Sequence, residues 1–528
     1  MTPTATHTPA IRTEHTRLFL NDEWIHADDG ATFPVENPAT GQILAHVADG
    51  CVADAERAMS AAGAAQADWA ATSPRFRSEI LRRAYDLVIA RTDVLAATMT
   101  AEMGKPLVEA RGEVAYAAEF LRWFSEEAVR ISGDYTTTGD GKNRIVVTRV
   151  PVGPCVLVTP WNFPLAMGAR KIGPAIAAGC TMVFKPAPQT PLTALALVAI
   201  LHEAGLPRGV LNVVTTTRAS KVVGSWMSSG IARKVSFTGS TAVGKILLVQ
   251  AAEHVMRSSM ELGGNAPFIV CADADVNRAV DGAMAAKMRN MGEACTAANR
   301  LFVHRAVEAE FTARLAERMG ALRVGDGGLE GTDVGPLVDL AGLQKVQSFV
   351  DDAVRRGARV IVGGQRMPGE GYFYQPTVLT DVSADSALMS AEIFGPVAPI
   401  IVFDDEDEVV ALANDTEWGL VGYVFTQDID RALRLSEALD VGMVGLNSGI
   451  VSNPAAPFGG VKQSGLGREG GRLGIDEYLE YKYLAIPRAQ RTASPLGRPG
   501  TRPPGATGPE PKMPRFPATY GRSTRTGG

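Results

Sequence analysis

Cysteine is scarce in this chain, with five residues among 528. Cys51, Cys155, Cys180, Cys271 and Cys295 are scattered, and their spacing matches neither a zinc nor an iron–sulfur site. An odd number without a repeated pattern also argues against a disulfide framework. The sequence therefore predicts no metal site and a reducing compartment, in which one thiol is available for chemistry.

Long apolar runs are also missing, whereas a membrane helix needs about 20 such residues. The longest candidate, residues 152–186, is interrupted by prolines and by Arg170 and Lys171. Residues 1–17 have no apolar core of the kind that a secretory signal contains, and we interpret them as a flexible N-terminus. We expect a cytoplasmic protein without membrane contact.

Basic charge is not in excess either. The chain has 52 Lys and Arg against 57 Asp and Glu, a formal net charge of −5. This balance argues against a nucleic-acid-binding protein, which normally presents a basic face. With 46% hydrophobic residues the composition is that of a globular protein, and the length predicts two or three domains.

Hydrophobic periodicity predicts an α/β fold. Residues 51–130 carry apolar residues at helical spacing. Between about 144 and 265, β-branched runs alternate with helical patterns, and a second alternation runs from about 263 to 464. Such alternation is typical of parallel strands joined by crossover helices.

The end of the chain has a different composition. Residues 488–528 are rich in Pro, Gly, Thr and Arg and nearly free of aliphatic side chains. Such a segment cannot bury enough apolar surface to offset its ordering entropy, so we interpret it as a disordered tail. Binding of a partner by this basic segment is the alternative.

Three separated segments contain residue types that carry chemistry: Asn162 in TPWNFP, Glu261 in MELGG and Cys295 in GEACTAANR. Each segment alone is weak evidence for a catalytic site; a single cysteine, for example, usually packs in a core. Together and in this order they resemble the aldehyde dehydrogenase superfamily, and the resemblance covers about residues 18–485. Further motifs of that superfamily stand at residues 184–186 (FKP), 392–396 (EIFGP) and 457–460 (PFGG).

The resemblance implies an aldehyde dehydrogenase-like fold. A Rossmann-type cofactor domain that binds NAD(P) is expected over residues 18–128 and 152–262, and an α/β catalytic domain over 263–464. Strands in residues 129–151 and 465–487 would form an oligomerisation arm, giving a homodimer or homotetramer.

The resemblance also implies catalytic roles. Cys295 matches a nucleophile whose addition to the aldehyde creates the tetrahedral carbon that hydride transfer requires. Asn162 matches a donor to the oxyanion, together with the backbone N–H of Cys295. Glu261 matches the general base that activates water to hydrolyse the thioester, which favours a free acid over transfer to coenzyme A.

Two positions beside the nucleophile depart from relatives. Glu293 stands where glutamine is common, and a carboxylate pointing inward would raise the pKa of Cys295. We expect Glu293 to face solvent, where it would have little effect. Ala297 replaces a second cysteine of the mammalian relatives, so we expect no redox disulfide.

The first α/β alternation, residues 144–265, contains no GxGxxG fingerprint, and FTGSTAVG takes its place in the superfamily. By resemblance Gly239 and Ser240 lie at a helix start near the pyrophosphate, where N–H groups favour an anion. The other implied cofactor-binding residues are Thr159, Pro160 and Trp161 in the cleft, Leu262 through its backbone at the nicotinamide amide, Lys185 at the adenosine ribose, Glu392 at the nicotinamide ribose and Phe394 beside it.

Pro188 bears on the choice of cofactor. Many NAD-preferring members have a glutamate there, which repels a 2′-phosphate. Proline removes this repulsion and Lys185 remains to attract the phosphate, so we expect NADP to be slightly favoured over NAD. Arg218 is a weaker candidate for a phosphate contact, because a solvated surface charge is the simpler interpretation.

Residues 442–484 resemble the succinate-semialdehyde dehydrogenase family. Arg170 and Arg289 match arginines that bind the distal carboxylate of its substrate, and Ser452 joins them. Arginine suits this role because its fork grips a carboxylate bidentately and stays charged. A structural salt bridge is the alternative for either arginine alone. The remaining expected substrate-binding residues are Phe163 and Phe458.

The sequence therefore predicts oxidation of succinate semialdehyde to succinate with reduction of NAD(P), a reaction whose usual setting is 4-aminobutyrate breakdown. Glutarate semialdehyde or another carboxylate-bearing aldehyde is the alternative, since one methylene discriminates by only ~10–200-fold. A catalytically inactive binding homologue is a remote alternative.

Overall fold

The computed structural model describes residues 13–489. The predicted flexible N-terminus and disordered tail fall mostly on residues 1–12 and 490–528, outside the described part. Within the described residues, no helix is both long and apolar enough to cross a membrane. No group of three or more His, Cys, Asp or Glu side chains there is arranged to hold a metal ion.

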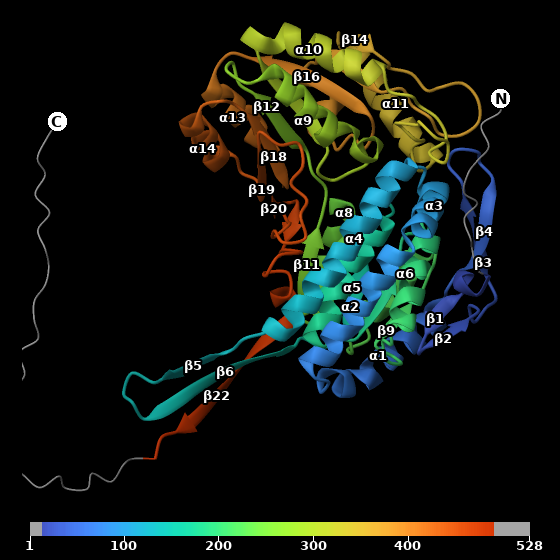
Figure 1. Ribbon diagram of the computed structural model, residues 1–528, viewed down its shortest axis with the longest axis vertical. Helices are drawn as coiled ribbons and strands as arrows, with labels where there is room; N and C mark the ends of the chain where they lie inside the picture. The colour runs from blue at the N-terminus through green and yellow to red at the C-terminus, as the bar shows by residue number, and fades with distance from the viewer. Residues whose placement is uncertain (1–12, 490–528) are drawn as a thin grey trace, which may run out of the picture. The chain divides into compact units, whose positions relative to one another are not determined.

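Four helices occupy the predicted helical region, which confirms that prediction (Figure 1). Ser73 caps the second of them by accepting a hydrogen bond from Phe76 N–H, and Pro74 occupies its first turn. Gly104 ends the third in a left-handed conformation (φ 95°). The helices are α1 (Val52–Ala70), α2 (Pro74–Ala90), α3 (Thr92–Met103) and α4 (Leu107–Glu127).

The first sheet has eight strands in the order β2-β1-β9-β8-β7-β10-β11-β21. The strands from β9 to β11 are parallel, as the alternation predicted, and the strands at both edges pair antiparallel. Its members are β1 (Leu18–Leu20), β2 (Glu23–Ile25), β7 (Cys155–Val158), β8 (Met182–Lys185), β9 (Leu211–Val213), β10 (Lys234–Thr238), β11 (Arg257–Glu261) and β21 (Gly465–Leu466), with connecting helices α5 (Pro164–Ala178), α6 (Pro191–Glu203), α7 (Ala219–Met227) and α8 (Thr241–Glu253).

The strand order reverses between β7 and β10. The chain runs from β7 outward to β8 and β9, and then returns to place β10 on the other side of β7. In open α/β sheets, ligands bind beyond the carboxyl ends of the strands at such a switch point. The fold therefore directs attention to the loops after β7 and β10.

The second sheet has seven strands in the order β14-β15-β16-β13-β12-β18-β19, and all but β14 run parallel. This confirms the second alternation. Its strands are β12 (Ala266–Val270), β13 (Ala298–His304), β14 (Arg359–Val362), β15 (Thr377–Thr380), β16 (Val397–Phe403), β18 (Val421–Phe425) and β19 (Met443–Leu446), and its helices are α9 (Val276–Met288), α10 (Arg305–Gly320), α11 (Leu340–Arg355), α13 (Glu406–Asn414) and α14 (Ile429–Ala438).

Each sheet has an apolar core of its own. Phe120, Leu121 and Ile172 are buried between α4, α5 and the first sheet, while Phe268 and Phe311 are buried between α10 and the second. Removal of this apolar surface from water is the main force holding each layer together.

Short elements complete the described chain. A three-stranded sheet in the order β22-β6-β5 combines the two segments expected to form an arm. These elements are β5 (Asp134–Thr137), β6 (Asn143–Pro151) and β22 (Leu479–Pro487), the pairs β3 (Thr32–Glu36) with β4 (Ile43–Ala48) and β17 (Trp418–Gly419) with β20 (Val461–Lys462), the helix α12 (Ala387–Ser390) and the 3-10 turns η1 (Thr13–Thr16), η2 (Ala128–Arg130), η3 (Arg289–Gly292) and η4 (Asp476–Tyr478).

Candidate active site

A cavity of about 200 Å³ lies where the loops after β7 and β10 meet the segment before β13. It brings together half of the predicted site residues from distant parts of the chain, whereas Glu261, Thr159, Lys185, Pro188 and the five predicted substrate-binding residues are not part of its lining. Its lining consists of Pro160, Trp161, Asn162, Met167, Thr238, Gly239, Ser240, Leu262, Gly263, Cys295, Lys345, Glu392 and Phe394.

Cys295 lies in a tight turn that the surrounding backbone fixes. Ala297 N–H donates to the carbonyl of Ala294 at 2.9 Å, which places Cys295 in the middle of the turn. A Cβ added to Gly264 would lie 2.6 Å from the carbonyl oxygen of Cys295, so only glycine allows this close approach. The half-buried thiol is thereby held at the cavity wall.

The surroundings of Cys295 keep the thiol protonated at neutral pH. Burial, together with the carboxylates of Glu392 and Glu261, raises the pKa of Cys295 to about 12. Arg170 and Arg289 act in the opposite direction but are outweighed. The nucleophile therefore needs a proton acceptor or an added positive charge before it can attack.

Asn162 follows β7 directly and lies beside the turn of Cys295. Its side-chain N–H donates to the carbonyl of Glu293 at 3.0 Å, and Asn290 donates to the same carbonyl at 3.0 Å. Since an amide nitrogen carries two hydrogens, the second N–H of Asn162 is available to a ligand.

Glu293 is buried, so the expectation that it faces solvent was wrong. Its side chain is 1% exposed, and one carboxyl oxygen accepts a hydrogen bond from Val338 N–H at 3.1 Å. Burial raises the pKa of Glu293 well above its usual range, which holds it in the neutral form. A neutral carboxyl group does not repel the thiolate, and Glu293 is not among the groups that shift the pKa of Cys295 most.

Glu261 ends β11 as a buried carboxyl group whose two oxygens lack hydrogen-bond partners within the described residues. Burial and the neighbouring Glu469 raise the pKa of Glu261 well above its usual range. A raised pKa makes the carboxylate a stronger proton acceptor, as a general base must be.

Glu469 is a functional neighbour that the sequence did not reveal. It forms buried ion pairs with Arg170 (2.7 Å) and Lys171 (2.5 Å). The structure therefore gives Arg170 the salt bridge that was the alternative to carboxylate binding. The Arg170 guanidinium also stacks on the Phe458 ring at 4.1 Å, so Phe458 packs beside it as expected.

Arg289, in contrast, has no carboxylate within ion-pair distance in residues 13–489. One of its guanidinium nitrogens lies 3.5 Å from the hydroxyl of Ser452, and the guanidinium lies over the Phe163 ring at 4.9 Å. It also lies over the ring of Tyr116 at 5.8 Å. Arg289, Ser452 and Phe163 thus meet as predicted, and Tyr116 is an addition.

The start of α8 has the geometry expected for an anion site. Ser240 caps the helix by accepting a hydrogen bond from Val243 N–H at 3.4 Å. A Cβ on Gly239 would lie 2.5 Å from the Phe237 ring, so glycine is required there. The free N–H groups of this helix start face the cavity region, where the helix dipole favours negative charge.

Lys185 and Thr159 lie next to each other at the carboxyl edge of the sheet, but they do not line the cavity. Thr159 N–H donates to the carbonyl of Lys185 at 3.2 Å. Burial lowers the pKa of Lys185 to about 8, and no acidic group of residues 13–489 offsets this shift. Pro188 follows three residues later and is half-buried.

Arg218 is neither free for a phosphate nor simply solvated. Its guanidinium forms an ion pair with Asp29 at 2.6 Å and is two-thirds buried. It also donates to the backbone carbonyl of Asp49. These contacts fix the start of α7. The interpretation of Arg218 as a solvated surface charge, which the sequence favoured, was therefore wrong.

Phe394 and Trp161 form one wall of the cavity, with ring centroids 5.5 Å apart at 86°. Phe394 holds a left-handed backbone conformation (φ 55°), a strain that is typical of functional loops. Glu392 accepts a hydrogen bond from Gly264 N–H at 3.3 Å, and burial raises the pKa of Glu392 to about 7. Leu262 N–H is occupied by the carbonyl of Ser464, which leaves the Leu262 carbonyl for a ligand.

Comparison with known proteins accounts for this constellation. Residues 24–484 match the model of the aldehyde dehydrogenase family. This chain belongs to that family.

Individual aldehyde dehydrogenases match over almost their whole length. A succinate-semialdehyde dehydrogenase from Paenarthrobacter nicotinovorans is 57% identical over 84% of this chain and 99% of its own. A glutarate-semialdehyde dehydrogenase from Pseudomonas putida is 50% identical over 89% of this chain and 97% of its own. The crystal structure of an Escherichia coli NADP-dependent enzyme has a TM-score of 0.89 at 47% identity, covering 90% of this chain and 98% of that one.

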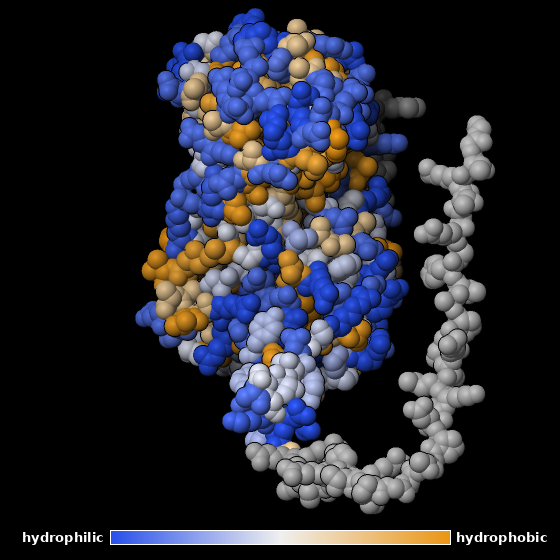
Figure 2. Space-filling view, turned by 90° about the vertical axis from the view of Figure 1, so that its left-hand side faces the viewer, coloured by the Kyte–Doolittle hydropathy of each residue, from blue (hydrophilic) through white to orange (hydrophobic). Residues whose placement is uncertain are grey.

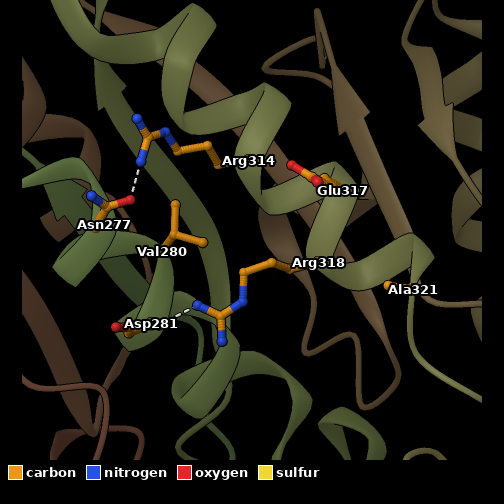
Figure 3. A pocket seen from close by; sticks show the side chains of 7 residues that line it. All are labelled: Asn277, Val280, Asp281, Arg314, Glu317, Arg318 and Ala321. Atoms are coloured by element: carbon orange, nitrogen blue, oxygen red, sulfur yellow. Dashed lines mark hydrogen bonds and ion pairs between the residues drawn. The ribbon is translucent and has the colours of Figure 1, made fainter.

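A second cavity of this aldehyde dehydrogenase contains none of the predicted site residues. It lies between α9 and α10, where Arg314 points to Asn277 and Arg318 to Asp281 (Figure 3). Each guanidinium is already paired with its neighbour across the groove.

Proposed function

We propose that this aldehyde dehydrogenase oxidises succinate semialdehyde to succinate through a covalent intermediate on Cys295, with NADP as the preferred hydride acceptor. The observation that carries the proposal is Arg289, whose guanidinium forms no ion pair within residues 13–489 and lies six residues before the nucleophile and beside Ser452. The succinate-semialdehyde dehydrogenase at 57% identity supports the same substrate.

The first step uses the turn of Cys295 and the amide of Asn162. As the sulfur attacks the aldehyde carbon, the C–S bond forms and the carbonyl π electrons move to oxygen. The second N–H of Asn162 and the backbone N–H of Cys295 stabilise that oxyanion. The thiol proton passes to water as the sulfur attacks, since the high pKa of Cys295 leaves little thiolate beforehand.

A nicotinamide cofactor, when bound, supplies the hydride acceptor and a positive charge near the sulfur. Loss of hydride leaves a thioester on Cys295. Glu261 then removes a proton from a water molecule, which attacks the thioester carbon and releases the acid and the thiol. Its pairing with Arg170 and Lys171 keeps Glu469 charged, and this negative charge favours proton uptake by Glu261.

Substitution of Arg289 by leucine tests the substrate assignment. We expect kcat/KM for succinate semialdehyde to fall by ~30–1,000-fold, because the substrate carboxylate loses a desolvated partner. Activity toward butanal, which has no carboxylate, should change little. Steady-state kinetics with both aldehydes measures the difference.

Arg170→Leu is the matched comparison. Because Arg170 already pairs with Glu469, its removal leaves a buried carboxylate without this partner and should lower kcat for both aldehydes. If Arg289→Leu lowers both activities equally, the arginine is structural and the substrate proposal fails.

The residues for a cofactor fit NADP. The α8 start offers N–H groups to a pyrophosphate, and the Leu262 carbonyl can accept from a carboxamide. Lys185 is a buried cation without an acidic partner in the described chain, and Pro188 brings no negative charge to repel a 2′-phosphate. The similarity to the E. coli NADP-dependent enzyme supports this choice.

Lys185 makes the cofactor preference depend on pH. With its pKa lowered to about 8, Lys185 is charged below pH 8 and neutral above it in the free enzyme. A 2′-phosphate binds the charged form, so the KM for NADP should rise above pH 8 by up to about tenfold per pH unit. The KM for NAD, which lacks this phosphate, should change little, and Lys185→Met should remove the difference. Equal pH dependence for both cofactors would contradict this role.

Assembly is proposed to follow the family arrangement of a homodimer or homotetramer. Apolar residues form patches among hydrophilic ones on the face in Figure 2. Val243, Ile246 and Val249 on α8 are 43–75% exposed, as suits an interface. Light scattering after size exclusion measures the mass. We also propose the domain organisation of the family, with a cofactor domain over residues 18–128 and 152–262, a catalytic domain over 263–464 and an oligomerisation arm over 129–151 and 465–487. A cytoplasmic location is proposed as well.

A further inference from the structure

We propose that the buried Lys105–Glu113 ion pair sets the position of the Asn162 amide and thereby controls the oxyanion site. Lys105 lies between α3 and α4, and Glu113 lies on α4. Neither belongs to a motif discussed above, and neither touches a reacting atom, so both are positioning residues. The inference rests on the role proposed for Asn162.

The Lys105 ammonium group joins three parts of the site. It lies 2.5 Å from a Glu113 carboxyl oxygen, donates to the backbone carbonyl of Asn162 at 2.8 Å and lies over the Phe163 ring at 4.3 Å. Its side chain is 1% exposed. A buried charge with this many partners holds them in one arrangement, because losing any of them is costly.

Glu113 extends the same contact to the start of α5. Its other oxygen accepts from the backbone N–H groups of Leu165 and Ala166 at 3.0 and 3.1 Å. Phe163, the residue before the helix, has no side chain able to cap it, so a carboxylate from α4 supplies the cap. Residues 162–166 are therefore fixed at both ends by one ion pair.

A ring of hydrogen bonds connects Asn162 to the segment that contains the nucleophile. Asn290 donates to the carbonyl of Asn162 at 3.1 Å and to that of Glu293 at 3.0 Å, and the Asn162 amide donates to the same Glu293 carbonyl. Glu293 lies two residues before Cys295. A shift of the Asn162 backbone therefore moves its amide relative to the sulfur.

The single substitution Lys105→Met should lower kcat by about 10²-fold, the effect of a misplacement of about 1 Å, with the KM values little changed. The sharper test is a double-mutant cycle with Asn162→Ala, which alone should cost about 10²–10³-fold. In the Asn162→Ala background, Lys105→Met should cost nothing further, because its effect acts through that amide.

Lys234→Met serves as the control. Lys234 is another fully buried lysine and pairs with Glu477, and it begins β10, whereas the loop at the other end of this strand meets the cavity. Once folded, this variant should keep its kcat. If Lys105→Met does not fold, Lys105→Met/Glu113→Gln replaces it, because no carboxylate is left unpaired and the glutamine oxygen still accepts from Leu165 and Ala166.

The outcomes separate this inference from the proposed function. A kcat loss that disappears in the Asn162→Ala background supports the positioning role. Equal losses in both backgrounds overturn it and leave the proposed function intact. An Asn162→Ala enzyme with normal turnover overturns the oxyanion assignment itself, and the positioning role with it.

Discussion

Replacement of Cys295 by serine is expected to abolish aldehyde oxidation, with kcat falling by about 10⁴-fold or more. A serine hydroxyl is a far weaker nucleophile than a thiolate, and the buried surroundings that raise the pKa of Cys295 would disfavour an alkoxide even more strongly. The measurement is the absorbance of NADPH formed from succinate semialdehyde. The variant should still bind the cofactor, as measured by fluorescence.

Cys51→Ser is the matched control for this loss. Cys51 is a partly exposed cysteine at the start of α1 and does not line the cavity, and serine is a favourable residue at a helix N-terminus. This variant should have wild-type kinetics. A Cys295→Ser enzyme with wild-type turnover would show that the reaction does not pass through this sulfur.

Substitution of Glu261 by glutamine should separate the two halves of the reaction. Hydride transfer can still occur once, so one NADPH per active site should form in a rapid burst. Steady-state turnover should then fall by ~10²–10⁴-fold, because the thioester awaits a water molecule without a base. Stopped-flow absorbance resolves the burst from the slow phase. A slow first turnover without a burst would assign Glu261 to activation of Cys295 instead of hydrolysis.

The same residue should govern the pH profile. Because burial raises the pKa of Glu261, its basic form becomes populated only as the pH rises, and hydrolysis should accelerate with it. Glu261→Gln should remove this rise. Persistence of the same pH dependence in the variant would show that another group titrates.

The roles of Cys295, Asn162 and Glu261 could be hypothesised from the sequence because each stands in a short motif of characteristic composition. The helices over residues 51–130 and the two α/β alternations were also predictable, since periodicity reflects which face of each element is buried. The structure adds that the reversal of strand order at β7 places these separate motifs around one cavity.

The partners of these residues could not be predicted in the same way. Glu469 reaches Arg170 across 299 positions of the chain, and Lys105 reaches Asn162 across 57. No local pattern encodes such pairings. Glu293 was misjudged because an acidic side chain is rarely buried, and only the packing of Val338 against it reveals the exception.

The most direct test of the account is mass spectrometry of Glu261→Gln after mixing with succinate semialdehyde and NADP. We expect one succinyl group to remain attached through a thioester and to map to the peptide that contains Cys295. Adding Arg289→Leu should strongly reduce this labelling but leave labelling by butanal unchanged. A protein that forms NADPH without any acyl group on Cys295 would contradict the account.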